Sequence, residues 1–396
     1  MIEISPIYNE KTMRMNWKLI VACLPIMAAA YAAAPDGATK LELPVEKNLF
    51  NVYSMEFSPD GKRVCLAATV STEMGASKGR VLLIDRAHNA LLWQADFAAP
   101  DSFAAVFPVQ CAVSGDRVYV LANVDTDSSP PNSKTHTYVY SFDGQGRKVA
   151  YQRLPLKPRA YGYAMDSTAD GVKVAGYIRD EDADSEYYSV YTLALSPELK
   201  VQGEPVIRKS GAYAQSVRAR IVGDSLYATG MFYPAKTSKK DLIDDFAASR
   251  LRLNGGYAWS THSGLGARFA DVFGGVAADG TIYTLAVGEG STSVLAVAPG
   301  GKSAPLVKYA SHYCDTGAIA AWGKGVIAVR ESCGSKAKDR SKANALVIID
   351  PVAGKESVLD WVREEPQFAA THGSAWAVLA KDKSRRLYFY SAAGGQ

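Results

Sequence analysis

The chain has 396 residues, of which 48% are hydrophobic and 21% are charged, which is the composition of a globular protein with ample material for a core. The formal net charge of +4 is nearly neutral for this length, and the sequence has no basic run with interleaved aromatic residues. These features argue against nucleic acid as a partner.

The first 34 residues differ in kind from the rest. Basic residues precede the apolar stretch Leu19–Ala34, which ends in small residues. A cationic start, a short apolar middle and a small-residue end predict a secretory signal, and the stretch is too short to predict a membrane span. We expect residues 1–32 to be the signal peptide, with translation starting at Met1, Met13 or Met15, and the mature protein to be periplasmic or secreted.

Cys23 allows a second interpretation of this segment. The residues Ile20-Val21-Ala22-Cys23 match the pattern at which lipoproteins are processed. Only four apolar residues separate Lys18 from Cys23, which makes a poor membrane-inserting segment. We therefore predict an ordinary signal peptide, with a lipoprotein anchor at Cys23 as the alternative.

A unit of roughly fifty residues recurs along the rest of the chain. It consists of a strand, a tight turn that contains glycine, and a second, more apolar strand. In the first unit, Met55–Phe57 precedes the turn and Arg63–Leu66 follows it. Glycine beside aspartate between two β-rich runs is a hairpin signal, because glycine tolerates positive φ. The turn glycines are Gly61, Gly115, Gly171, Gly223, Gly280, Gly323 and Gly373.

Further strands complete each unit. A third strand such as Arg80–Ile84 follows the hairpin, and a weaker fourth strand such as Leu91–Gln94 often comes next. Four antiparallel strands per period predict a propeller blade, and we expect residues 33–396 to form a single all-β, seven-bladed β-propeller domain. The seventh unit ends without a fourth strand. We expect Lys40–Pro44 to supply it, which would close the ring and remove an open edge.

Two kinds of motif resemble known propeller repeats. The segment Phe57–Arg63 (FSPDGKR) resembles the repeat core of the YVTN and TolB-like bacterial propellers. Ile84–Trp93 is similar to a repeat of the quinoprotein-type propellers, and Ile349–Lys355 resembles the start of that repeat. These motifs specify turns and strand packing, so the resemblance implies a fold and not an activity.

Four cysteines remain after the signal segment, and an even number in an exported chain permits two disulfides. Cys314 and Cys333 fall at facing positions of one antiparallel hairpin, which predicts a disulfide between them. Cys65 and Cys111 fall on neighbouring strands of the first two units. We predict a disulfide there as well, with two buried free thiols as the alternative.

Residues eight to ten positions before each turn glycine should line the mouth of the central channel, because the inner strands begin there. They form a ring rich in tyrosine with arginine nearby, which is the composition of a binding surface. Tyrosine packed between blades is the alternative. The predicted mouth residues are Tyr53, Phe107, Arg159, Tyr161, Tyr163, Tyr213, Gln215, Arg268, Asp271, His312, Tyr313, Asp315 and Glu365.

Few residues point to a cofactor or to catalysis. Asp180, Asp182 and Asp184 alternate in an acidic hairpin tip that could bind Ca²⁺ through oxygen ligands, although such tips are commonly just solvated. We predict no other metal and no cofactor. The nucleophile-elbow pattern at Gly75–Gly79 joins two strands and lacks the helix that its chemistry needs.

The sequence favours a non-enzymatic propeller that binds a protein or peptide partner through its channel-mouth face. This face carries the long loops 123–137, 179–187, 234–247 and 331–343. We expect a monomer or a subunit of a hetero-complex. The alternative is a propeller enzyme, either a metal-dependent hydrolase of the lactonase or lyase type or the large subunit of a periplasmic quinoprotein amine dehydrogenase.

Overall fold

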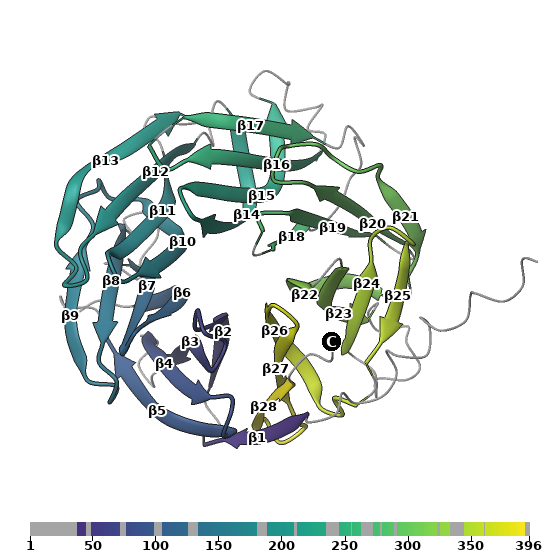
Figure 1. Cartoon of the computed structure of the whole chain (residues 1–396), viewed down its shortest axis with the longest axis horizontal. Helices are drawn as coiled ribbons and strands as arrows, with labels where there is room; N and C mark the ends of the chain where they lie inside the picture. Colours follow the sequence, from purple (N-terminus) through teal and green to yellow (C-terminus); the bar gives the residue numbers. More distant parts are fainter. Residues whose placement is uncertain are drawn as a thin grey trace, which may run out of the picture.

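The computed structural model of the chain consists of β-strands arranged as a ring of sheets (Figure 1). Residues 1–37, including the predicted signal peptide and Cys23, lie outside the described part. The structure describes residues 38–44, 49–71, 77–98, 105–125, 134–179, 188–209, 212–234, 245–254, 256–262, 272–277, 279–288, 291–311, 313–322, 325–332, 344–359 and 361–392.

Four sheets are each built from four consecutive antiparallel strands. In every sheet the first strand lies nearest the centre of the ring and the fourth lies outermost (Figure 1). The strands are β10 (Ala160–Thr168), β11 (Gly171–Arg179), β12 (Tyr188–Leu195) and β13 (Val201–Lys209); β14 (Ala212–Val222), β15 (Ser225–Pro234), β16 (Asp245–Arg252) and β17 (Tyr257–His262); β18 (Val272–Val276), β19 (Ile282–Gly288), β20 (Ser291–Val297) and β21 (Val307–Ala310); and β22 (Tyr313–Trp322), β23 (Gly325–Ser332), β24 (Asn344–Asp350) and β25 (Lys355–Val358).

The first eight strands after β1 form one larger sheet that consists of two such units. A single parallel pair, Ser77 of β4 with Ala105 of β6, joins them. The all-β propeller architecture is thus confirmed, and the predicted count of seven blades rests on counting these two units separately. The strands are β2 (Leu49–Phe57), β3 (Arg63–Ser71), β4 (Ser77–Asp85) and β5 (Ala90–Phe97), then β6 (Ala105–Ser114), β7 (Arg117–Asp125), β8 (Thr135–Phe142) and β9 (Lys148–Arg153).

The last sheet joins the two ends of the described chain. Its strands β26 (Glu365–His372), β27 (Ala375–Lys381) and β28 (Leu387–Ala392) come from the C-terminal part. Its fourth strand is β1 (Thr39–Leu43), which pairs antiparallel with β28. The prediction that an N-terminal strand closes the last sheet is confirmed.

The hairpin turns between first and second strands have the backbone that their glycines predict. Gly115 has φ 55° and Gly373 has φ 57°, both in the left-handed region that side chains with a Cβ disfavour. At Gly61 (φ 68°) a Cβ would also lie 2.8 Å from the Nδ1 atom of His372. These turns therefore require glycine for conformation and, at Gly61, for space.

Side chains at these turns connect neighbouring sheets. In each case a side chain near the hairpin turn of one sheet donates a hydrogen bond to a turn carbonyl of the next sheet. The last bond crosses from the final sheet to the first, so the same contact also spans the seam of the ring. The pairs are Arg63 with Gly115 (2.6 Å), Lys173 with Gly223 (2.9 Å), Trp322 with Ser374 (3.1 Å) and His372 with Pro59 (3.1 Å).

The core lies between neighbouring sheets. In one cluster, Val81 of the first unit packs with Val113 and Tyr140 of the second. The same cluster contains a disulfide between Cys65 of β3 and Cys111 of β6, whose Cα atoms are 6.2 Å apart. The predicted Cys65–Cys111 bridge is thus present in the structure. The Cys314 side chain and Cys333 lie outside the described residues, so their disulfide stays a prediction.

Arg330 breaks the repeat at a buried position. Each second strand has a buried apolar residue at its first or second position: Val64, Val118, Val172, Leu226, Ile282, Val326 or Trp376. Four residues further on, six strands have alanine or glycine: Ala68, Ala122, Gly176, Gly230, Ala286 and Ala380. In β23 the same position is Arg330, which has no exposed surface.

Polar groups of two sheets surround this arginine. Its guanidinium donates hydrogen bonds to the hydroxyls of Thr292 and Ser311 in the preceding sheet. Its Nη2 lies 3.7 Å from Oε2 of Glu356 in its own sheet, and the Tyr309 hydroxyl donates to the same carboxylate oxygen (3.3 Å). Burial raises the pKa of Tyr309, so this phenol stays a hydrogen-bond donor.

We predict that Arg330→Ala lowers the free energy of unfolding by about 3–5 kcal/mol, because it leaves Glu356 as a largely buried carboxylate without its cation. Combining it with Glu356→Gln should recover part of the loss. Urea denaturation of both variants tests this, with the exposed Lys355→Ala on the same sheet as a control. A loss no larger than that of the control would contradict the prediction.

Candidate binding face at the mouth of the ring

The inner strands β2, β6, β10, β14, β22 and β26 share a bulge near the end at which they begin. We call this end of the ring the mouth face. The bulge occupies an equivalent position in all six strands. The residue just after it always pairs with the residue that lies three positions after the first buried apolar residue of the second strand. A bulge turns a side chain out of the regular alternation, and bulges are common next to functional sites. The residues that the register passes over are Tyr53, Val109, Tyr163, Ser216, Val217, Gly317 and Gln367.

Two of these bulged residues, Tyr53 and Tyr163, are among the predicted mouth residues. Tyr53 is 37% exposed, so part of this residue reaches solvent. Val109 and Gln367 were not predicted, because counting back from the turn glycine does not reveal where a bulge lies.

Three tyrosines of one sheet form a stack on this face. The ring of Tyr177, in β11, stacks with Tyr161 (centroids 4.9 Å apart, planes 21° apart) and with Tyr163 (6.0 Å and 23°), both in β10. All three side chains are partly exposed. Each aromatic pair adds about 0.5–1.5 kcal/mol beyond its area burial. The stack is therefore a rigid aromatic surface that still reaches solvent.

A neighbouring sheet fixes the backbone that carries the stack. Asn123 of β7 accepts a hydrogen bond from the Gly162 amide (2.8 Å) and donates one to the Gly162 carbonyl (3.3 Å). A Cβ on Gly162 would lie 2.9 Å from the Leu121 side chain, so only glycine fits here. Tyr161 and Tyr163, on either side of Gly162, are thereby held in place.

Arg159 lies in the turn that leads into β10, two residues before Tyr161. Arg159 has φ 68°, a left-handed backbone that costs roughly 1–3 kcal/mol for a residue with a side chain. Its amide donates to the Thr135 carbonyl (2.8 Å). The Thr135 hydroxyl donates to Asp125 (2.6 Å) and lies 3.3 Å from the Tyr161 hydroxyl. The structure thus brings together the predicted residues Tyr161 and Tyr163 and adds Tyr177, while Thr135 links the backbone of Arg159 to the Tyr161 hydroxyl.

Other predicted mouth residues lie on different sheets. Phe107 of β6 pairs with Asn123, and its side chain is partly exposed. Glu365 begins β26 and pairs with Lys381. Their strands place both at the mouth face, but on different sheets from the tyrosine stack.

For some of the remaining predicted residues the structure describes only the backbone, and the others lie outside the described part of the chain. Tyr213 and Gln215 belong to β14, and Tyr313 and Asp315 belong to β22, at the mouth ends of both strands. Their side chains lie outside the described part. The residues wholly outside it are Arg268, Asp271, His312, Asp180, Asp182 and Asp184.

A layer of charged residues lies closer to the hairpin turns. Glu56 of β2, Asp166 of β10 and Arg220 of β14 each pair with the residue that follows the first buried apolar residue of the next strand. Burial raises the pKa of Glu56, while Arg220 and a hydrogen bond with Gln110 act in the opposite direction. Burial also raises the pKa of Asp166. Neither carboxyl was predicted as a site residue, because a single acidic residue within a strand forms no recognisable sequence motif.

Comparison with solved structures identifies the fold. The chain is similar to the β-propeller domain of the trilobed protease from Pyrococcus furiosus, with a TM-score of 0.50 and 10% identity over 89% of this chain and 96% of that one. It is also similar to puromycin hydrolase, with a TM-score of 0.50 and 12% identity over 86% of this chain. The match spans about half of that enzyme (52%). At these identities the likeness establishes a β-propeller and nothing about activity.

A further similarity is to TolB from Acinetobacter baumannii, with a TM-score of 0.36 and 14% identity over 85% of this chain and 82% of that one. A scan of protein-family models finds no match, and a search of curated proteins finds no significant one. The described part of the chain has no helix long and apolar enough to cross a membrane. Among the same residues, no three His, Cys, Asp or Glu side chains are grouped to hold a metal ion.

We predict that Glu56→Gln stabilises the protein more at pH 8 than at pH 4. A raised pKa means that the folded state binds the proton more tightly than the unfolded chain, so ionisation above that pKa opposes folding. Glutamine removes this cost, whereas at low pH both side chains are neutral. Urea denaturation at both pH values tests this, with the exposed Glu204→Gln as a control. A difference between variant and wild type that falls as pH rises would contradict it.

Proposed function

We propose that the protein is an exported, non-enzymatic propeller that recognises a protein or peptide partner through its mouth face. The observation that carries the proposal is the partly exposed stack of Tyr161, Tyr177 and Tyr163, with Arg159 two residues before Tyr161 in the sequence. Tyrosine and arginine are the residue types most enriched among those that dominate binding energy. A tyrosine loses little conformational freedom on binding, and less still when its ring is already held in a stack.

Tyrosines that only pack between sheets look different in this protein. Tyr119, Tyr140 and Tyr191 are at most 2% exposed and belong to the cores between sheets. The three stacked residues are instead partly exposed, although Tyr163 also packs against the core between its sheet and the next. A partly exposed aromatic stack offers a partner a preformed contact surface.

Export is supported by two independent features. The first is the secretory pattern of residues 1–32, and the second is the disulfide between Cys65 and Cys111. Disulfides persist in the periplasm and outside the cell and are rare in reducing compartments. We therefore place the proposed binding function in the periplasm or the medium.

An enzyme is the second candidate, favoured by one observation. Glu56 and Asp166 are partly buried on inner strands, where desolvation raises the pKa of each, and perturbed carboxyls are frequent at catalytic sites. Structural ion networks perturb carboxyls as well. Hydrolysis of lactone or ester substrates by the purified protein, lost in Glu56→Gln, would favour this candidate over the binding function.

The binding proposal predicts that Tyr161→Ala combined with Tyr163→Ala abolishes capture of a partner from a periplasmic extract of the producing bacterium. Loss of hot-spot residues typically weakens binding by about 2–4 kcal/mol, which is at least a tenfold loss of capture. The matched control is Tyr151→Ala, because Tyr151 is 49% exposed but lies on the outer strand β9.

Quantitative mass spectrometry of the captured proteins provides the measurement, and circular dichroism verifies that both variants fold. Wild type and Tyr151→Ala should recover the same protein. If the intact mouth recovers no protein, or the double variant recovers it equally well, the proposed function is wrong.

A further inference from the structure

The strand β1 is the one element of the last sheet that comes from the other end of the chain. It lies outside β28 at the rim of the ring (Figure 1), and its Lys40 carbonyl accepts a hydrogen bond from the Asn89 side chain of the first unit (2.9 Å). Five residue pairs hold it, from Thr39 with Ser391 to Leu43 with Leu387. Among the described residues, β28 is the only strand that β1 pairs with.

The side chains of β1 alternate in a way that matches its site. Leu43 is buried and Leu41 is partly buried against the core between the last sheet and the first. Lys40 and Glu42, on the opposite face, are exposed and reach charged and aromatic groups of the last sheet. The edge of β28 therefore accepts an alternating basic–apolar–acidic–apolar strand.

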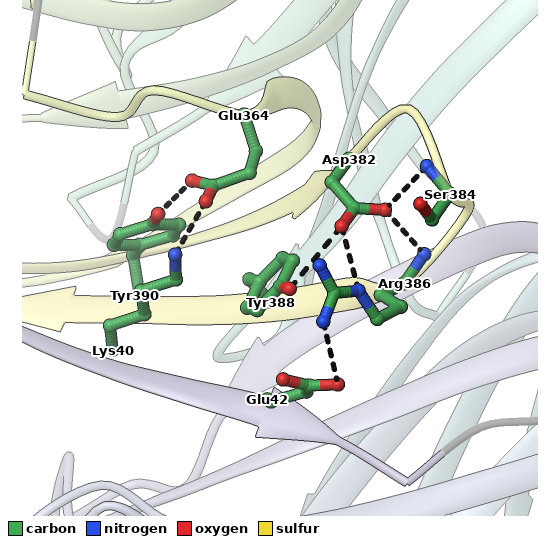
Figure 2. Close-up of polar contacts among 8 residues, drawn as sticks. All are labelled: Lys40, Glu42, Glu364, Asp382, Ser384, Arg386, Tyr388 and Tyr390. Atoms are coloured by element: carbon green, nitrogen blue, oxygen red, sulfur yellow. Dashed lines mark hydrogen bonds and ion pairs between the residues drawn. The ribbon is translucent and has the colours of Figure 1, made fainter.

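Lys40 makes the most specific of these contacts (Figure 2). Its ammonium donates a hydrogen bond to Glu364 (2.5 Å), which also accepts one from the Tyr390 hydroxyl. The same ammonium lies 4.1 Å from the centre of the Tyr388 ring, which is cation–π distance. Lysine, glutamate and tyrosine thus define one half of the recognition site.

Glu42 and Thr39 extend the recognition along the strand. Glu42 lies 3.9 Å from Arg386, which the adjacent Asp382 holds through a 2.8 Å ion pair (Figure 2). At the other end, the hydroxyl oxygens of Thr39 and Ser391 are 3.1 Å apart. All these contacts join β1 to the last sheet and would be identical if β1 came from another molecule.

Release of β1 requires much less than unfolding of the protein. It breaks one five-residue ladder and the hydrogen bond from Asn89 to the Lys40 carbonyl, exposes two leucines and separates ion pairs that are already partly in water. Local openings of this kind occur well below the free energy of global unfolding. They leave β28 as an open edge, which is a ready template for another strand.

We propose that the edge of β28 is a strand-exchange site whose second occupant is residues 38–44 of another copy of this chain. The exchanged pair reproduces every β1–β28 contact, so the two states differ only in which copy supplies β1 to each last sheet. Such exchange of an identical element is a low-cost route to dimers. The proposal goes beyond partner binding and does not depend on the mouth face.

A covalent lock tests this proposal. In the variant Thr39→Cys with Ser391→Cys, the two new cysteines replace directly paired residues whose side-chain oxygens are 3.1 Å apart. Oxidised as a monomer, it keeps β1 on its own sheet. Its reduced form is compared with wild type in the same reductant, because reductant can also act on the Cys65–Cys111 disulfide. Wild type, reduced variant and oxidised variant are incubated at high concentration, and size-exclusion chromatography with light scattering measures the dimer fraction.

We expect wild type and reduced variant to form dimers that increase with concentration and incubation time, and the oxidised variant to form at least tenfold fewer. Re-reducing the oxidised sample should restore dimerisation, which excludes misfolding as the reason. Dimers of the oxidised variant equal to those of wild type would overturn the proposal, as would an absence of dimers in all three samples. Loss of partner capture by the mouth variants bears only on the proposed function.

Discussion

Closure of the ring is the constraint on which the rest of the structure depends. Each sheet buries both faces against its neighbours, so the first and last sheets need each other. The chain meets this requirement through β1, whose five pairs with β28 make the last sheet complete and whose Leu43 enters the core shared with the first sheet. The hydrogen bond from His372 to Pro59 crosses the same seam at the hairpin turns.

Contacts between neighbouring sheets also hold the mouth face rigid. The tyrosine stack belongs to one sheet, but Asn123 of the preceding sheet fixes the backbone at Gly162, and Thr135 holds the turn at Arg159. A side chain that is held before binding loses less entropy on binding. The left-handed backbone of Arg159 persists because neighbouring elements hold it, as is common at functional positions.

The predictable part of the fold is local chemistry that repeats. Glycine beside aspartate marks each hairpin, and Lys40–Pro44 stands out because it has no unit of its own, so turns and closure could be derived from the sequence. The pairing of Cys65 with Cys111 followed from adjacent units. Such inferences need only the order of strands, which a repeat makes regular.

The less predictable part depends on register. Counting from a turn glycine reached Tyr53, Tyr161 and Tyr163, but Tyr177 lies on the second strand and enters the stack only because its register places it opposite Tyr161. Arg330 looks like an ordinary strand residue until aligned with the small residues of the other sheets. Burial and neighbours decide its role, and neither is visible in one segment of sequence.

The most direct test of the central claim is site-specific photo-crosslinking in the periplasm. A photoreactive phenylalanine derivative replaces either Tyr53, at the mouth face, or Tyr151, on the outer strand β9. Both side chains are exposed, so the two positions differ in place and not in accessibility. Binding through the mouth face predicts a discrete crosslinked partner at Tyr53 and none at Tyr151. The same adduct at Tyr151, with none at Tyr53, would contradict it.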